Sequence, residues 1–245
     1  MTQDLAPHAP SARPPSRRRP LVLFVAPIVV AVLGIGLLAW RPWRPAATQL
    51  ADLGTAPTFS LTDQNARPVR SADLAGKVQI VSFLFPYCST YCPYTTHQLL
   101  TVENRLTAAG LADKVHFTAF NLAPADSGPS DMASYLKQYG VDPADPHWSF
   151  LTGSQSEVDA AVRGGYGLQY ERIPLDAGGP NGADAVPVQP NALADAKHVN
   201  FDIAHNEVIN LVGGDGVIRG AFDHVVDVTT DELYGAITKL LAAHR

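Results

Sequence analysis

A mostly apolar run without charge, residues 78–84, is followed closely by two cysteines and then by a helical pattern. The run reads Val-Gln-Ile-Val-Ser-Phe-Leu, which is typical of a strand buried at the centre of a sheet. Cys88 and Cys92, the only cysteines among 245 residues, come next. Apolar residues then recur at near-helical spacing from Pro93 to Ala109. The sequence therefore predicts a central strand, a turn that carries the thiols, and a helix.

The rest of the chain alternates strand and helix patterns in the order of a thioredoxin-like sheet. Capping and turn residues mark most of the boundaries, such as Ser154 and Glu157 in a capping box. The expected elements are a hairpin over 59–69, a strand over 115–122, a helix capped by Ser130 that ends at Gly140, a strand over 148–151, a helix over 154–163, an irregular loop over 176–197, a hairpin over 208–222 and a helix over 230–243. We therefore predict an α/β, thioredoxin-like domain with an added β-hairpin.

Composition narrows the function classes. Hydrophobic residues make up 46% of the chain, which is enough for a buried core. The formal net charge is -5, and no long basic run occurs outside the N-terminus. Nucleic acid is therefore not expected as a partner, because its phosphates are bound by clustered Lys and Arg.

The N-terminus has the pattern of a membrane anchor. Residues 1–20 are rich in Pro and Arg, and residues 21–40 contain no charge. Twenty helical residues span about 30 Å, the thickness of a bilayer's hydrocarbon core. Trp40 and Trp43 would lie at the far interface, and the arginines before residue 20 would hold that end in the cytoplasm. The alternative is a cleaved signal peptide, whose apolar stretch is usually shorter, about 7–15 residues.

These features divide the chain into four parts. We expect a cytoplasmic basic segment over 1–20, a transmembrane anchor over 21–40, a linker over 41–57 and the thioredoxin-like domain over 58–245. The expected location is the cytoplasmic (inner) membrane, crossed once, with the C-terminal domain on the outer, periplasmic side.

Export leaves three roles open for the cysteine pair: a structural disulfide, redox chemistry or metal binding. A bond between Cys88 and Cys92 would close a loop of only a few residues, so its entropic contribution to stability would be small. Cys92 at the start of a helix would feel the positive end of the helix dipole, which favours its thiolate. Thiolates are soft donors that select Cu(I), and imidazole suits copper in both oxidation states.

Three segments together resemble the Sco/SenC family. They are the Cys-x-x-x-Cys-Pro motif at Cys88, the run Trp-Ser-Phe-Leu-Thr-Gly from Trp148, and the stretch from His205 into the hairpin that ends at Phe222. The resemblance covers roughly residues 55–245 and the N-terminal anchor. It implies a membrane-anchored, thioredoxin-fold copper protein that serves the binuclear copper centre of cytochrome c oxidase. It also implies that Cys88, Cys92 and His205 bind copper, as Cu(I) and also as Cu(II).

The sequence departs from the family pattern at several positions. An acidic residue usually precedes the histidine and Ser or Thr follows it, whereas this chain has Ala204 and Asn206. The family's Asp-Pro-x-x-Asp-x-Pro becomes Ala-Pro-Ala-Asp-Ser-Gly-Pro at 123–129, and the Asp-Pro of the hairpin turn becomes Gly213-Gly214. These changes bear on histidine orientation and partner docking more than on metal binding.

Other side chains compete for roles near the thiols. His198 is the best substitute ligand, and His97 points away from Cys92 on the predicted helix. Tyr87 and Tyr91 flank the thiols and are expected to shield them or to contact a partner. The remaining histidines are expected to lack a partner cluster: His116, His147, His224 and His244.

The leading hypothesis is a copper metallochaperone that passes its ion to the copper-site subunit of cytochrome c oxidase or a related oxidase. The alternative is a thiol–disulfide oxidoreductase in which Cys88 attacks and Cys92 resolves, with other exported copper or thiol-redox proteins as partners. Against a general thioredoxin role, the spacer between the cysteines has three residues instead of two. A membrane-tethered copper or redox sensor is a third, less favoured, option.

Overall fold

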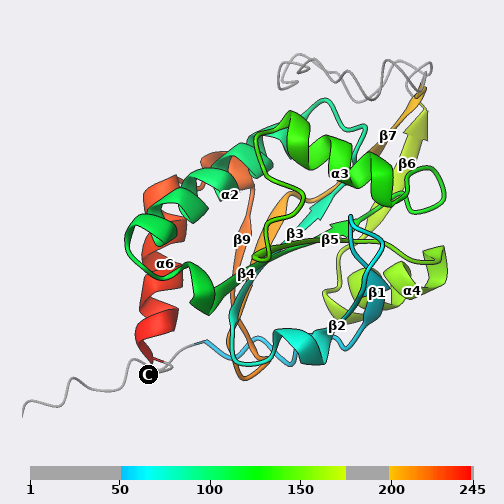
Figure 1. Ribbon diagram of the computed structural model, residues 1–245. Helices are drawn as coiled ribbons and strands as arrows, with labels where there is room; N and C mark the ends of the chain where they lie inside the picture. Colours follow the sequence, from blue (N-terminus) through cyan, green and yellow to red (C-terminus); the bar gives the residue numbers. More distant parts are fainter. Residues whose placement is uncertain (1–50, 175–198, 244–245) are drawn as a thin grey trace, which may run out of the picture. The chain divides into compact units, whose positions relative to one another are not determined.

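The computed structural model describes residues 51–174 and 199–243 (Figure 1). The predicted anchor over 21–40, most of the linker, the loop over 176–197, His198 and His244 lie outside these ranges. Within them, none of the helices is both long enough and apolar enough to cross a bilayer.

A five-stranded mixed sheet forms the centre of the domain, in the order β5-β4-β3-β8-β9 (Figure 1). The predicted central strand, β3, is flanked by a parallel β4 and an antiparallel β8. The five strands are β3 (Val78–Leu84), β4 (Val115–Asn121), β5 (Trp148–Leu151), β8 (Val208–Val212) and β9 (Ile218–Asp223). Every residue of β3 and β4 is buried, which explains why neither strand contains a Lys, Arg, Asp or Glu.

Helices cover both faces of the sheet, and the side chains of β3 alternate between them. Val78 and Ile80 belong to the apolar cluster under α2 (Tyr91–Ala108), α3 (Pro129–Gln138) and α6 (Thr230–Ala243). Val81 and Phe83 belong to the opposite cluster under α4 (Gln155–Asp159) and the π-helix η3 (Ala160–Gly165). Parallel strands joined by helices, with an antiparallel hairpin at one side, make the α/β thioredoxin-like fold that the element order predicts.

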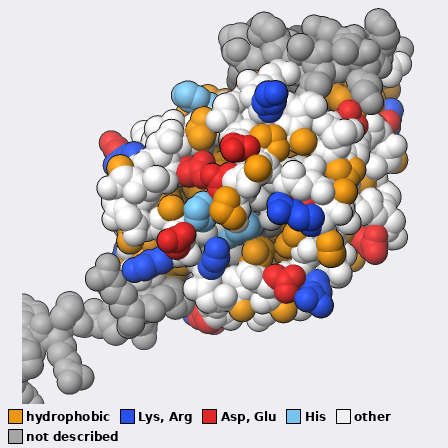
Figure 2. Space-filling model, in the orientation of Figure 1, with side chains coloured by type: hydrophobic (Ala, Val, Ile, Leu, Met, Phe, Trp, Pro, Cys, Tyr) orange, Lys and Arg blue, Asp and Glu red, His pale blue; other side chains and the backbone are white. Residues whose placement is uncertain are grey.

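Short elements complete the described chain. The predicted first hairpin is β1 (Ser60–Thr62) and β2 (Pro68–Arg70), and the 3-10 turns are η1 (Ser71–Leu74), η2 (Ala112–Lys114) and η5 (Val225–Asp227). The last part of the predicted linker hydrogen-bonds to the domain: Leu53 N–H donates to the Ile218 carbonyl at 3.0 Å. Basic and acidic side chains are interspersed on the face seen in Figure 2.

A helix begins at the residue that the sequence predicts where the side chain of that residue caps the helix. Ser154 accepts a hydrogen bond from the Glu157 N–H, and the Glu157 carboxylate accepts one from Ser154 N–H, as the capping box predicts. The prediction for α3 was wrong by two residues, because Gly128 and not Ser130 is its N-cap. There the Asp131 carboxylate accepts the Gly128 N–H at 3.0 Å.

One strand pair is absent from the sequence prediction. β6 (Tyr170–Pro174) pairs antiparallel with β7 (Phe201–His205) as a separate two-stranded sheet. His205 is thus the last residue of β7 and pairs with Tyr170. Two residues separate it from the start of β8. The missed strands are only five residues long and mix polar and apolar residues without a clean alternation, which is a weak signal beside the buried strands β3 and β4.

Candidate metal centre

Both cysteines lie where β3 gives way to α2. Cys88 is in the connecting turn, where its N–H donates to the Phe85 carbonyl at 3.0 Å. Cys92 is the second residue of α2, which begins two residues before the predicted start at Pro93. The Cys92 carbonyl accepts from the Thr96 hydroxyl at 2.8 Å. The fold therefore holds Cys92 on a helix and leaves Cys88 on a turn.

The two cysteines are thiols that are not joined by a disulfide, and their sulfurs are hydrogen-bonded to each other and removed from water. Cys88 is 4% exposed and Cys92 is 1% exposed. The hydrogen bond from Cys92, with a smaller contribution from Thr90, lowers the pKa of Cys88. Burial, followed by the neighbouring Cys88, raises the pKa of Cys92. Burial therefore opposes the influence of the helix dipole that the sequence predicts at Cys92, and Cys88 is the more acidic thiol.

Aromatic packing brings β7 alongside the cysteine turn. The rings of Phe85 and Phe201 lie 5.1 Å apart, and Phe201 is the first residue of β7. The Arg172 guanidinium stacks 3.4 Å above the Phe201 ring and so ties β6 to the same place. Tyr87 is buried against Phe85, with ring centroids 5.4 Å apart. The strand that ends at His205 therefore runs beside the loop that carries Cys88.

His205 is a buried imidazole with a defined tautomer. Its side chain is 3% exposed, and Nδ1 lies 2.9 Å from the Asn206 carbonyl oxygen. A carbonyl oxygen accepts only, so Nδ1 carries the proton and Nε2 is the nitrogen with a free lone pair. Burial lowers the pKa of His205, which favours the neutral imidazole that a metal requires.

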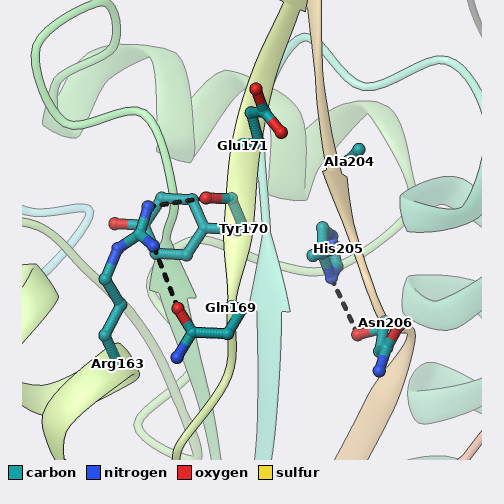
Figure 3. A pocket seen from close by; sticks show the side chains of 7 residues that line it. All are labelled: Arg163, Gln169, Tyr170, Glu171, Ala204, His205 and Asn206. Atoms are coloured by element: carbon teal, nitrogen blue, oxygen red, sulfur yellow. Dashed lines mark hydrogen bonds between the residues drawn. The ribbon is translucent and has the colours of Figure 1, made fainter.

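An open hollow of about 720 Å³ adjoins His205, between the ends of β6 and β7 (Figure 3). In Figure 3 the Arg163 guanidinium reaches from η3 to the Tyr170 carbonyl and to Gln169, across from His205. The hollow is lined by Arg163, Gln169, Tyr170, Glu171, Ala204, His205 and Asn206.

Two buried carboxyl groups near the thiols were not singled out from the sequence. Oε1 of Glu207 lies 3.4 Å from Nε2 of His205. Burial first, and the nearby Cys88 second, raise the pKa of Glu207 to about 8. Burial also raises the pKa of Asp202. The charge of Asp202 opposes the lowering of the Cys88 pKa that the hydrogen bond from Cys92 causes. The available signal was an acidic residue on each side of His205 in an otherwise apolar stretch.

The donor atoms of the three predicted copper ligands do not surround a common point in the described structure. A metal with bonds of about 2.0–2.3 Å requires donor atoms within about 4.6 Å of one another. Among the described residues, the group of three whose donor atoms meet a 4.8 Å limit is Glu103, Asp145 and His147. The trio of Cys88, Cys92 and His205 is not such a group, so binding one ion through all three requires a rearrangement that brings their donor atoms together.

The prediction that His147 lacks a partner cluster was wrong. Nδ1 of His147 lies 2.9 Å from Asp145, and Nε2 lies 3.2 Å from Asp113. Both ring nitrogens are already engaged by carboxylates, so we interpret this group as an ion-pair network at the edge of the sheet. Elsewhere, His97 is exposed on α2 and His116 is buried against Ser149.

The family model and the curated relatives point to the same family. A family model described as SCO1/SenC matches residues 47–242. A SCO1 protein homolog of Bacillus subtilis (strain 168) is 28% identical over 102 residues, which are 41% of this chain and about half, 51%, of that protein. A putative copper-binding protein of Stutzerimonas stutzeri is 24% identical over 164 residues, 67% of each chain.

A solved structure supports the fold. Bradyrhizobium japonicum ScoI, determined with copper bound, superposes with a TM-score of 0.56 at 22% identity, and the match covers 76% of this chain and 99% of that one. The family model alone spans most of the chain and almost the whole folded unit. The chain belongs to the SCO1/SenC family.

Proposed function

We propose that this protein is a copper metallochaperone that acts in cytochrome c oxidase assembly and holds its cargo through Cys88, Cys92 and His205. The observation that carries the proposal is the pair of buried, reduced thiols beside β7, the strand that ends in a neutral imidazole. The family membership and the copper-bound relative are consistent with copper as the cargo.

The donor set suits Cu(I). Two thiolates select a soft monovalent ion, and one imidazole completes a low-coordinate site with room for an incoming ligand. Binding requires both thiols to be deprotonated, so the proton that Cys92 shares with Cys88 must leave as the ion enters. Burial of both sulfurs protects the loaded thiolates from water and from unrelated thiols.

Handover follows from the unequal anchoring of the ligands. Cys92 is fixed on α2 and packed in the main apolar cluster, whereas His205 ends a strand beside the open hollow. We infer that the thiols of the recipient enter from that hollow and that His205 is the first ligand to leave. The recipient on this reading is the copper-site subunit of cytochrome c oxidase or of a related oxidase.

Location is part of the proposal. Residues 21–40 would anchor the chain in the cytoplasmic membrane, and the thioredoxin-like domain would face the periplasm. The family match begins at residue 47, near the boundary where the anchor would give way to the folded unit.

A second function is favoured by one specific observation, the unequal acidity of the two thiols. A more acidic Cys88 and a less acidic Cys92 are the pattern of an attacking and a resolving cysteine. In this reaction the Cys88 thiolate attacks a recipient disulfide and Cys92 displaces the recipient's thiolate. The chain ends as a disulfide and the recipient as two thiols ready for copper. The near-complete burial of both sulfurs makes this the less favoured reading, because attack needs access.

The proposal is tested by Cu(I) competition with a chromogenic chelator on the full chain in detergent. We expect one tightly bound ion, loss of binding in Cys88→Ser and Cys92→Ser, and an affinity about 10–100-fold lower in His205→Ala. His97→Ala, an exposed histidine on α2, is the matched control and should bind as the wild type does. Equal affinity in His205→Ala and His97→Ala would reject the ligand assignment. Fast disulfide turnover in a chain that binds no copper would favour the oxidoreductase.

A further inference from the structure

Glu207 lies in the two-residue connection between β7 and β8, and it faces inward. Its side chain is 13% exposed, and its Oε1 is 3.4 Å from Nε2 of His205. Among the described residues, no Lys or Arg forms an ion pair with Glu207, and the titratable group that approaches it is the neutral imidazole of His205. A carboxyl group buried without a basic partner is costly, so its position calls for a compensating role.

The nitrogen of His205 that faces Glu207 is the one available to a metal. Nδ1 is committed to the Asn206 carbonyl, which leaves the lone pair of Nε2 next to the Glu207 oxygen. Two donors 3.4 Å apart can share one ion, because metal–nitrogen and metal–oxygen bonds of about 2.0–2.2 Å allow separations up to about 4 Å. An ion bound at Nε2 would therefore lie within reach of Glu207.

Glu207 is also electrostatically linked to both sulfurs. The charge of Cys88 acts on the Glu207 carboxyl, and the charge of Glu207 acts on Cys92. The carboxyl group thus contacts the imidazole and also interacts through its charge with the thiol pair. Asp202, the other buried acid here, interacts with Cys88, but no contact ties it to His205.

We propose that Glu207 is a further copper ligand, which binds Cu(II) together with Cys88, Cys92 and His205 and contributes little to Cu(I). This inference rests on the proposed copper-binding function. Carboxylate is a hard oxygen donor that suits Cu(II), whose sites take four donors in a tetragonal arrangement, whereas thiolates suit Cu(I). The carboxylate therefore sets how strongly this chain holds the oxidised ion relative to the reduced one.

The test measures Cu(II) and Cu(I) affinity separately, by chelator competition, in the full chain in detergent. Glu207→Gln keeps the size of the side chain and removes the anionic donor. We expect its Cu(II) affinity to fall about 10–100-fold, its Cu(I) affinity to stay within about threefold, and the hyperfine splitting of its Cu(II) EPR spectrum to change. Glu171→Gln, an exposed carboxyl group lining the adjacent hollow, is the matched control and should change neither affinity nor spectrum. Glu207→Asp, which retains an oxygen donor, should recover part of the Cu(II) affinity.

Two results would overturn the inference. One is an unchanged Cu(II) affinity and EPR spectrum in Glu207→Gln. The other is an equal loss of both oxidation states, which would indicate a structural role, as would a lower melting temperature of the copper-free variant. Either result leaves the proposed function standing as long as Cys88→Ser abolishes binding. A wild-type chain that binds neither ion would reject the proposed function itself.

Discussion

At the scale of single residues, burial and hydrogen bonding shift the pKa values of the two neighbouring thiols in opposite directions. The Cys92 thiol is the more buried of the pair and keeps its proton, which it donates to Cys88. The position of Cys92 at a helix start indicates only that the dipole favours its thiolate. The order of acidity of the two predicted ligands depends on desolvation by the folded core, which the sequence does not show.

The ion-pair network around His147 provides a residue-scale prediction. Burial raises the pKa of Glu103 from 4.5 to about 7. The folded protein therefore holds this proton more tightly than the unfolded chain, so the contribution to stability is complete below about pH 4.5 and is lost as the pH rises through about 7. At pH 8, Glu103→Gln should have a higher melting temperature than the wild type, by about 2–4 °C for each kcal/mol gained. Near pH 4, where Glu103 is protonated, the two proteins should melt at the same temperature.

The measurement is a pair of thermal melts at each pH by circular dichroism, with the exposed Asp223→Asn as control. A Glu103→Gln variant that melts below the wild type at pH 8 would mean that the ionised carboxylate is stabilising. The ion pairs with His147 would then outweigh the cost of burial.

At the scale of elements, the long buried strands and the capped helices were predictable and the β6–β7 pair was not. The helix over 230–243 and the strand over 78–84 coincide with α6 and β3, because each has a strong period and clear ends. β7 was missed because its five residues are half polar and its partner is distant in sequence. The position of His205 at the end of β7 was therefore accessible only from the fold, whereas its role as a ligand stays a prediction.

Gly214, in the turn between β8 and β9, provides an element-scale prediction. Gly214 packs on the turn before β3: its carbonyl accepts the Gly76 N–H at 2.9 Å, and a Cβ there would lie 2.9 Å from the Gly76 carbonyl. Gly214→Ala should therefore destabilise the domain by about 1–3 kcal/mol. Chemical denaturation checks this value.

Gly235 is the control with the opposite sign. It is exposed in the middle of α6, and nothing lies within 4 Å of an added Cβ. Gly235→Ala should stabilise the domain by about 0.5–1 kcal/mol, because alanine is the better helix former. If both alanines shift stability in the same direction, the close approach at Gly214 does not constrain the turn.

At the scale of the whole molecule, we propose that a membrane anchor precedes the folded unit, which begins near Thr48. The fold class followed from element order, and the ligand trio followed from the family resemblance. The proximity of Glu207 to that trio followed from neither, because the sequence does not reveal which acidic residue turns inward at the β7–β8 connection.

The anchor gives a prediction at this scale. The full chain should sediment with membranes and resist extraction by high salt and carbonate, whereas a chain beginning at Thr48 should remain in the soluble fraction. A protease added to spheroplasts should digest the domain of the full chain, since it faces outward. Release of the full chain by salt alone, or protection of its domain until the cells are lysed, would contradict the predicted topology.

The central claim is that two sulfurs and one imidazole bind a single soft ion. X-ray absorption at the copper edge of the Cu(I)-loaded chain tests it most directly, because the method counts sulfur and nitrogen neighbours of the metal. The account predicts two sulfur ligands and one nitrogen ligand in the wild type, and loss of the nitrogen in His205→Ala with both sulfurs retained. A wild-type spectrum with fewer than two sulfurs, or one that His205→Ala leaves unchanged, would contradict it.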